Sequence, residues 1–235
     1  MVILADNRIK GSALSALSSI AESVLLMPAA DHLQEGVASH PDMLLFIGFE
    51  HIFCHKRYFE QNCELIERIS ALTGYEICIS DEPTDEKYPH DVLFNAVLLG
   101  KRLICNTKTV SKLILSCAEK YGYEIVHVPQ GYTKCSVAVV SDNAIITSDK
   151  AISSICSSLG IDVLTVTEGH ISLPPYDYGF IGGTCGTYGD KIYFCGSLEK
   201  HPHVESIKSF CKNHGKTAIS LSDGTLQDVG SLLFI

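Results

Sequence analysis

The order of apolar and polar positions repeats along this chain. Each repeat begins with an apolar run, turns at glycine or short polar residues, and continues into a second apolar run. Apolar residues at helical spacing follow, usually as far as a glycine, and one more short apolar segment closes the repeat. Apolar runs of this length predict buried strands, and tight polar turns between two of them predict hairpins. Each repeat is therefore predicted to form a ββαβ unit.

Residues 42–79 show the unit most clearly. Residues 42–47 and 52–54 predict its hairpin, and residues 75–79 alternate as its third strand. Apolar residues at helical spacing lie between the second and third strands. Gly74 is expected to end this helix, because glycine tolerates the left-handed backbone found after a helix C-terminus.

The other four units have the same order of elements. Their first strands are predicted at residues 97–99, 136–140, 180–185 and 229–235, their second strands at 103–105, 144–147, 192–195 and 2–5, and their third strands at 125–128, 163–166, 218–221 and 24–27. The helix of the last unit is predicted at residues 12–23. This unit is split between the two termini, so the C-terminal strand is expected to pair with the N-terminal strand.

The period of the repeat predicts one closed body. Equivalent positions lie roughly 42 to 51 residues apart, a range typical of stacked or radial repeats. Five such units use almost the whole chain, so residues 1–235 are expected to form a single domain. Closure of the ring also removes the unpaired strand edge that an open ring would leave.

The amino-acid composition limits the expected binding partners and the expected cellular compartment of the protein. Hydrophobic residues make up 46% of the chain, and 18 basic against 27 acidic residues give a net charge of −9. Nucleic acids and anionic membranes attract basic surfaces, so we expect neither as a partner. The apolar stretch at the N-terminus is too short for a signal peptide, and no apolar run reaches the length of a membrane span. We therefore expect a cytoplasmic protein.

The ten cysteines favour a structural role. None forms a Cys-x-x-Cys pair, and Cys54, Cys105 and Cys195 occupy equivalent strand positions in three units. Cysteines at equivalent apolar positions are expected to be small core side chains rather than disulfide partners. Two histidine groups are candidate metal ligands, namely residues 201, 203 and 214, and residues 51 and 55. Neither supplies three or four coherent ligands, so no metal and no cofactor is expected.

Five ββαβ units around a pseudo-fivefold axis resemble the pentein, or α/β-propeller, fold along the full length of the chain. The likeness is sharpest at residues 93–100, 131–137 and 223–232. These stretches look like those that carry the active site in dimethylarginine dimethylaminohydrolases, arginine deiminases and amidinotransferases. The resemblance implies an α/β fold with a site on the axis.

The same resemblance implies a chemistry that this chain lacks the residues to perform. In those enzymes a cysteine attacks the guanidinium carbon, a histidine shuttles the proton, and acidic residues hold the cation. Here Tyr132 stands at the histidine position, Asn95 at the aspartate position, and Asp228 on or beside the cysteine position. No cysteine follows Cys211. Thiol chemistry on a guanidine is therefore not expected, since function depends on the site and not on the fold.

The loops that lead into the first strand of each unit are expected to line an axial pocket. Its predicted ligand-binding residues are Asn95, Tyr132, Lys134, Asp177, Tyr178 and Asp228. Asp42 and Asp91 are interpreted as turn or capping residues at strand entrances. Among the aspartates, Lys134 is interpreted as a neutralising ion-pair partner, the alternative being an amine held for catalysis.

Residues 169–186 form the most unusual loop. Two prolines stiffen it, two tyrosines add aromatic surface, and several glycines allow close approach of the backbone. It is the best candidate for a binding loop. Gly182 and Gly183 have a second interpretation, in which they relieve crowding near the axis.

Three functions remain open at this point. The favoured hypothesis is a non-catalytic or divergent relative that binds a small, cationic or guanidino ligand in the axial pocket. The alternatives are an active guanidine-modifying hydrolase or amidinotransferase with rearranged residues, and a protein-interaction module. The oligomeric state is not predicted.

Overall fold

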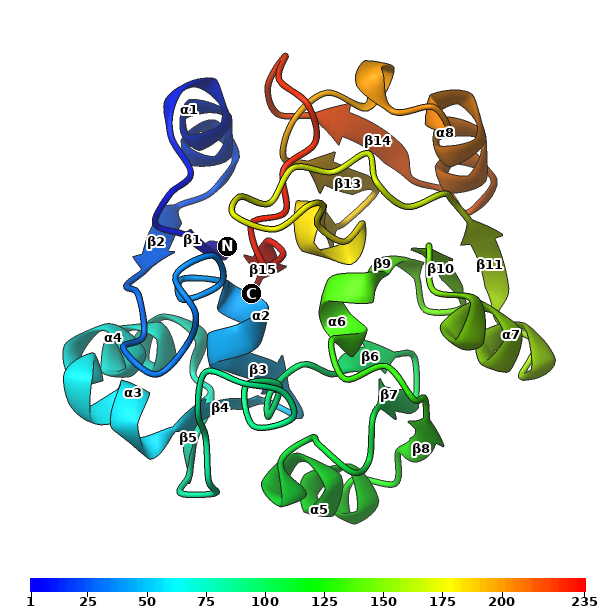
Figure 1. The fold of residues 1–235 in the computed structure, drawn as a ribbon. Coiled ribbons are helices and arrows are strands. Elements are labelled where there is room, and N and C mark those ends of the chain that lie inside the picture. The colour runs from blue at the N-terminus through cyan, green and yellow to red at the C-terminus, as the bar shows by residue number, and fades with distance from the viewer.

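The computed structural model describes residues 1–235 and contains five three-stranded sheets arranged as a ring (Figure 1). In every sheet the middle strand pairs antiparallel with the strand nearest the axis and parallel with the outer strand. A helical segment connects the middle strand to the outer strand in each case. The predicted five-bladed α/β-propeller of ββαβ units is confirmed.

From the inner strand outward, the five sheets contain the following strands. They are β15 (Leu233–Phe234), β1 (Val2–Asp6) and β2 (Ser23–Met27); β3 (Leu45–Gly48), β4 (His51–His55) and β5 (Glu76–Ser80); β6 (Val97–Leu99), β7 (Arg102–Cys105) and β8 (Glu124–His127); β9 (Val137–Ser141), β10 (Ala144–Thr147) and β11 (Asp162–Thr165); and β12 (Cys185–Tyr188), β13 (Lys191–Phe194) and β14 (Thr217–Ser220).

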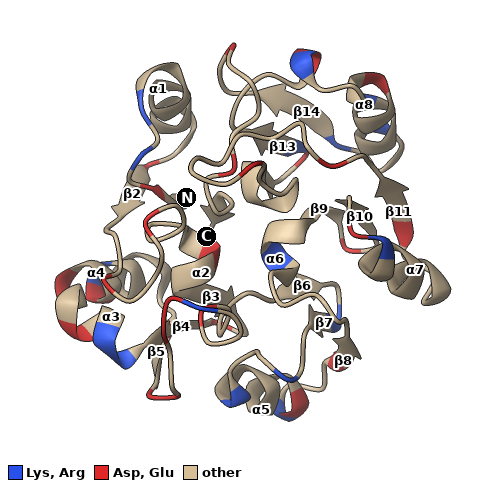
Figure 2. Ribbon diagram, viewed as in Figure 1, with Lys and Arg blue, Asp and Glu red and all other residues tan.

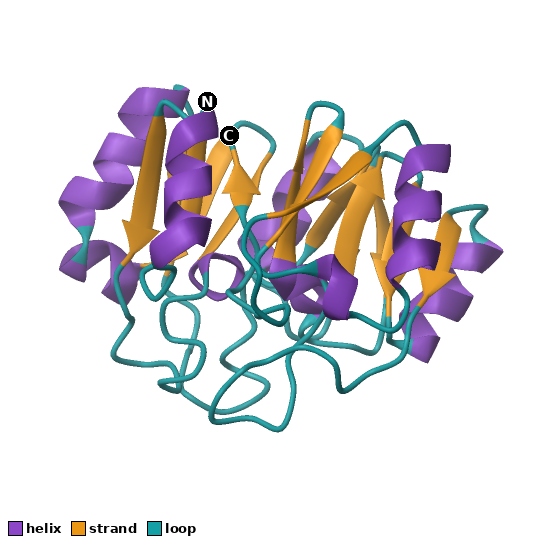
Figure 3. Cartoon of the chain, turned by 90° about the horizontal axis from the view of Figure 1, so that it is seen from above, coloured by secondary structure: helices purple, strands orange, loops and turns teal.

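The longer helices lie on the outside of the ring, as Figures 1 and 3 show. They are α1 (Gly11–Ile20), α3 (Lys56–Gln61), α4 (Cys63–Thr73), α5 (Lys112–Lys120), α7 (Lys150–Ser158) and α8 (Val204–Asn213), with the 3₁₀ helix η2 (Leu198–Lys200) before α8. Gly74, Gly122, Gly160 and Gly215 follow four of these helices with φ of 74°, 70°, 74° and 70°. The prediction that a glycine ends most of the helices, made explicitly for Gly74, is confirmed. None of the helices is long and apolar enough to cross a membrane.

The inner strands begin later than predicted. Residues 42–47, 136–140, 180–185 and 229–235 were each expected to be continuous strands. Instead, α2 (Pro41–Leu44), α6 (Thr133–Ser136) and the 3₁₀ helix η1 (Gly182–Thr184) precede β3, β9 and β12, and β15 is only two residues long. In three of the four, a single helical turn brings the segment from the loop into the narrow space at the axis. Three of the helical segments lie close to the axis in Figure 1.

The two termini close the ring. Ile3 pairs with Phe234 and Leu4 with Leu233 in the antiparallel β1–β15 ladder. Val2 and Ile235 exchange two backbone hydrogen bonds of 2.8 and 2.9 Å. The predicted pairing of the C-terminal strand with the N-terminal strand is therefore confirmed.

The core lies between the sheets and the outer helices and between neighbouring units. Cys54, Cys105 and Cys195 are buried in it, as expected of small apolar side chains. Burial raises the pKa of the Cys54 and Cys105 thiols to about 12 each. These thiols consequently stay neutral and unreactive at physiological pH.

Candidate functional site

A cavity of about 490 Å³ opens at the loop end of the axis. Figure 3 shows the connecting loops gathered on this side of the molecule, opposite the two termini. We call this cavity the loop-side pocket. It is lined by Gln34, Val37, His40, Met43, Lys87, Tyr88, Tyr132, Cys135, Leu173, Tyr176, Asp177, Tyr178, Phe180 and Asp228.

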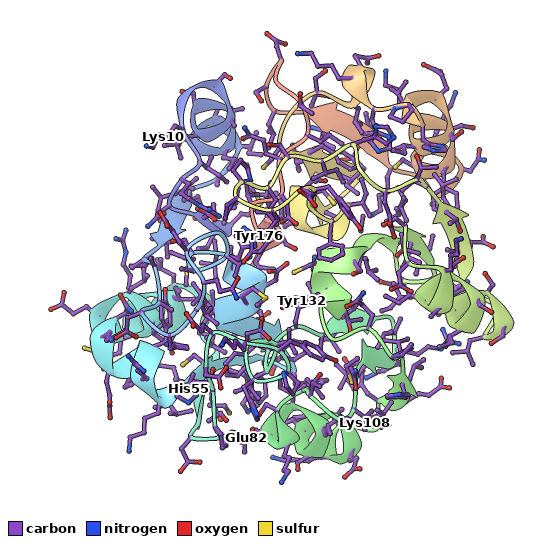
Figure 4. All side chains as sticks on the ribbon, viewed as in Figure 1. Lys10, His55, Glu82, Lys108, Tyr132 and Tyr176 are labelled. Atoms are coloured by element: carbon purple, nitrogen blue, oxygen red, sulfur yellow. The ribbon has the colours of Figure 1, made fainter.

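Aromatic side chains form much of its wall. Tyr132 stacks on Phe180 with ring centroids 6.1 Å apart, and Tyr88 lies 6.0 Å from Tyr132. Tyr176 and Tyr178 are 38% and 40% exposed, so their rings remain available at the mouth. Figure 4 shows Tyr132 and Tyr176 near the middle of the ring. The pocket therefore offers several aromatic faces to a ligand.

Hydrogen bonds hold these tyrosines in place. The Tyr132 hydroxyl donates to Oδ2 of Asp91 at 2.5 Å, the Tyr176 hydroxyl donates to Gln34, and the Tyr178 hydroxyl donates to Glu168 at 3.2 Å. Burial raises the pKa of Asp91, and the hydrogen bond from Tyr132 opposes that shift. Asp91 thus positions an aromatic wall residue, and the expectation that it caps a strand entrance does not describe its side-chain contact.

Asp228 lies in the wall of the pocket and is only 5% exposed. Its Oδ2 accepts the backbone N–H of Phe180 at 2.8 Å, and its Oδ1 accepts that of Gly230 at 3.0 Å. Burial raises the pKa of this carboxyl group, while neighbouring His40 and the two N–H groups oppose the shift. Asp228 is thus a buried acid, and any further positive partner would stabilise its charged form.

Two glycines make room for this carboxylate. A Cβ added to Gly183 would lie 1.9 Å from Oδ1 of Asp228, and one added to Gly179 would lie 2.4 Å from its Cβ. A Cβ on Gly182 would come within 2.4 Å of the Lys134 and Val137 carbonyl oxygens. Crowding near the axis therefore accounts for Gly182 and Gly183.

His40 is a site residue that the sequence pattern did not reveal. It is 1% exposed and lines the pocket, with Nδ1 3.8 Å from Oδ1 of Asp228 and Nε2 3.6 Å from Oδ2 of Asp6. Arg8 binds Asp6 through both carboxylate oxygens. Neither ring nitrogen of His40 has a hydrogen-bond partner. The available signal was a histidine beside Pro41 in a loop predicted to face the axis.

A network of polar groups lies beneath the pocket. Oδ1 of Asn95 accepts the backbone N–H groups of Lys134 and Cys135 at 2.6 and 3.2 Å. Its Nδ2 donates to the backbone oxygen of Asp42 at 3.1 Å and contacts Sγ of Cys135 at 3.0 Å. Asn95 is itself 1% exposed. It therefore joins α2 to α6 instead of lining the pocket.

Asp42 belongs to the same network, and its interpretation as a turn or capping residue was wrong. Its Oδ2 accepts the Ser231 hydroxyl at 2.6 Å, and the Cys135 thiol lies 3.4 Å from both of its oxygens. The side chain is 1% exposed. It thus receives side-chain donors from two distant segments and acts as a buried link between them.

Lys134 does not form the expected ion pair. No carboxylate lies within 4.0 Å of its Nζ, which donates to the Ser231 hydroxyl oxygen at 2.7 Å. Its side chain lines a second cavity of about 260 Å³ between the inner strands. Of the six predicted residues, Tyr132, Asp177, Tyr178 and Asp228 line the loop-side pocket, Asn95 lies below it, and Lys134 faces the other cavity.

The thiols nearest the axis are poor nucleophiles. Burial and the nearby carboxylates of Asp42 and Asp228 raise the pKa of Cys135 well above its ordinary value. Burial raises the pKa of Cys185 to about 12. A reactive cysteine needs the opposite, an electropositive environment that favours the thiolate.

The ring of five ββαβ units around an axis, with a pocket at its loop end, is the pentein fold. The chain belongs to the family of unknown function DUF6873, whose model matches residues 4–233. No curated protein matches it in sequence.

Similar solved structures are guanidine-modifying penteins. A mutant of the Pseudomonas aeruginosa enzyme DDAH, in complex with citrulline, superposes with a TM-score of 0.60 at 10% identity, over 94% of this chain and 91% of that one. The amidinotransferase SxtG from Microseira wollei gives 0.56 at 11% identity, over 89% and 74%. Agmatine deiminase from C. jejuni gives 0.54 at 9% identity, over 94% and 76%. At these identities the likeness establishes the fold alone.

Proposed function

We propose that the loop-side pocket binds a small organic cation, with a guanidinium or amidinium group as the favoured class. The cationic group is held by Asp228 and the aromatic faces around it. No cysteine takes part, so this is a divergent or non-catalytic pentein that lacks the thiol chemistry of guanidine-modifying enzymes.

The buried carboxylate of Asp228 is the observation that carries this proposal. A buried acid is costly unless it meets a positive partner or several donors. Asp228 receives two backbone N–H groups, and its closest cationic candidate is His40, at 3.8 Å. A ligand cation in the pocket would stabilise its charged form.

The aromatic wall supports the same class of ligand. Cations are attracted to the faces of tyrosine and phenylalanine rings, by about 0.5–1 kcal/mol at exposed sites and about 2 kcal/mol when the contact is desolvated. Tyr132, Tyr176, Tyr178 and Phe180 surround the pocket, whereas Lys87 is the only lysine or arginine that lines it. A planar cation bound in one pose contacts both the Asp228 carboxylate and the aromatic rings. The names of the similar structures, which include an amidinotransferase and an agmatine deiminase, point to the same group.

The raised pKa of Cys135 argues against the enzymatic alternative. Attack on a guanidinium carbon needs a thiolate. Cys135 is the one thiol in the loop-side pocket, and it is fully enclosed between carboxylates that disfavour its ionisation. A hydrolase with rearranged residues would therefore need a nucleophile other than this cysteine.

Calorimetry with guanidine, benzamidine, arginine and agmatine tests the proposal on the native chain and on Asp228→Asn. We expect at least one compound to bind, and to bind at least about tenfold more weakly to the variant, since loss of a buried charged partner costs about 2–5 kcal/mol. Asp190→Asn is the control for loss of one negative charge, because Asp190 is exposed at a turn and does not line the pocket. Equal affinity for the native chain and Asp228→Asn, or no binding by any of the four compounds, would reject the proposal.

Turnover distinguishes binding from catalysis. Each bound compound is incubated with stoichiometric protein and followed for release of ammonia, urea or a modified guanidine. We expect none. Product formation that survives Cys135→Ser would instead favour the hydrolase or amidinotransferase with rearranged residues.

A further inference from the structure

The axis carries a second cavity, which we call the inner-strand channel. Its volume is about 260 Å³, and it shares no lining residue with the loop-side pocket. Every inner strand contributes to its wall, with Ile47, Leu98, Val139, Thr187 and Leu233 as examples. The wall is predominantly apolar, and the volume is below the roughly 300–1,000 Å³ of most drug-sized sites. The channel therefore suits a small ligand with an apolar body.

Lys134 supplies a charge to this apolar space. It lies on α6, directly before inner strand β9, and lines the channel without lining the loop-side pocket. Figure 2 shows basic colour on α6 and acidic colour on α2 near the centre of the ring. Its ammonium group has three donors, of which one is used, in the bond to Ser231. No carboxylate lies within 4.0 Å of it.

The other polar groups of the channel are already engaged or neutral. Asp42 is 1% exposed and receives the Ser231 hydroxyl and the Cys135 thiol. The Thr187 hydroxyl donates to the Val139 carbonyl oxygen at 2.5 Å. Cys185 remains a neutral thiol because its environment is apolar and enclosed. Lys134 is the one cationic group of the channel, and two of its three donors are unused, although the Ser231 hydroxyl links it to the carboxylate of Asp42.

We propose that the inner-strand channel binds a small monocarboxylate with an apolar tail. The carboxylate accepts hydrogen bonds from Nζ of Lys134, and the tail lies among the apolar side chains of the inner strands. Such a ligand is complementary to both the Lys134 ammonium and the apolar wall. An anionic partner stabilises a partly buried ammonium, and an apolar tail displaces water from the apolar wall. The residues that line this site are different from those that line the loop-side pocket.

Isothermal titration with hexanoate, hexan-1-ol and hexylamine tests the proposal on the full-length chain. We expect hexanoate to bind, hexan-1-ol to bind at least about tenfold more weakly, and hexylamine not to bind. Lys134→Gln is expected to weaken hexanoate at least tenfold, whereas Lys200→Gln, at an exposed lysine, leaves it unchanged. Hexanoate binding should fall as ionic strength rises, since it depends on an ion pair.

A second variant keeps the test decisive if Lys134→Gln folds poorly. Val139→Phe retains the lysine but fills the channel, and it is expected to abolish hexanoate binding. Asp228→Asn, at the other cavity, is expected to retain it. The proposal is overturned if hexanoate does not bind, if hexan-1-ol or hexylamine binds as tightly, or if Val139→Phe binds hexanoate like the native chain. Failure of guanidinium compounds to bind the loop-side pocket has no bearing on these outcomes.

Discussion

Oδ1 of Asp228 lies 3.8 Å from Nδ1 of His40, and both side chains are almost fully buried. The other ring nitrogen of His40 faces Asp6 at 3.6 Å. One imidazole is thus placed between two buried carboxylates, at a distance slightly too long for a hydrogen bond to either. Asp6 has Arg8 as a partner, whereas Asp228 faces the pocket. Asp228 is therefore the carboxylate of this group that has no basic side chain within hydrogen-bonding distance.

Asp228 gives the stability of the native protein a defined dependence on pH. Its pKa in the folded state is raised above the ordinary value of 3.8, chiefly by burial. The folded protein then binds more protons at this site than the unfolded chain, so its contribution to stability falls as pH rises above about 3.8 and through the raised value. Asp228→Asn removes this titration. We expect the free energy of unfolding of the variant, relative to the native protein, to improve between pH 4 and pH 8.

Urea unfolding at several pH values checks this expectation. Asp190→Asn, at an exposed turn, corrects for the general effect of removing one negative charge. The stability of Asp228→Asn relative to the native protein could instead decline with pH. In that case the folded state would favour the charged carboxylate, and burial of Asp228 would no longer explain why the pocket should bind a cation.

Gly183 is expected to be intolerant of even one methyl group. A Cβ at this position would lie 1.9 Å from Oδ1 of Asp228, in a fully buried segment. Overpacking of this kind costs about 1–3 kcal/mol, so Gly183→Ala should lower the free energy of unfolding by about that amount. It should also displace Asp228 and weaken cation binding.

Gly224→Ala is the matched control, since no atom lies within 4 Å of an added Cβ there and the residue is exposed. Its stability should stay within about 0.5 kcal/mol of the native value. Asp228→Ala should lessen the cost of Gly183→Ala, because the clashing carboxylate is then gone. Full additivity of the two substitutions would show that the clash is not the source of the cost.

Alkylation separates structural from reactive thiols. Cys63 is exposed, whereas Cys135 and Cys185 are buried with raised pKa values. Iodoacetamide at pH 8 is expected to label Cys63 first and to leave both axial cysteines unmodified while the protein stays folded, as followed by peptide mass spectrometry. Labelling in urea supplies the reference for full accessibility. Rapid modification of Cys135 in the folded protein would restore the case for an enzyme.

Local signals in the sequence were sufficient for most of the fold. Hairpins depend on apolar runs and tight turns, and the helix ends depend on glycines such as Gly74, so both could be predicted from neighbouring residues. The helical turns that precede inner strands β3, β9 and β12 could not be predicted in this way. They arise where five segments converge on one axis, and the pattern of residues 42–47 carries no sign of that crowding.

The site was less accessible to sequence reasoning for a related reason. Tyr132 and Asp228 were recognised because they replace residues of known position in similar enzymes. His40 was missed because its proximity to Asp6 and Asp228 depends on residues far apart in the chain. The ion pair expected of Lys134 was wrong because the Ser231 hydroxyl lies between its Nζ and the carboxylate of Asp42, and Ser231 is far from both residues in the chain.

The last six residues hold the ring together, and their deletion is expected to be severe. Residues 230–235 contribute the β15 pairing, the two bonds between Val2 and Ile235, and the buried side chain of Leu232. Ser231 adds hydrogen bonds to Asp42 and to the carbonyl of Gly182. At about 1 kcal/mol for each hydrogen bond and about 2 kcal/mol for a buried leucine, the loss exceeds that of a typical point substitution.

A chain ending at residue 229 should therefore melt at least about 10 °C lower than the full chain, on a scale of about 2–4 °C for each kcal/mol in a protein of this size. Phe234→Ala is the comparison, because it removes a ring that stacks on Tyr188 and Tyr193 but leaves the backbone ladder intact. Its effect on Tm should be clearly smaller, since closure depends on main-chain pairing more than on this side chain. Differential scanning calorimetry of the three proteins at one pH measures both values. Equal melting temperatures for the truncated and full chains would mean that the other four units are stable without the pairing that closes the ring.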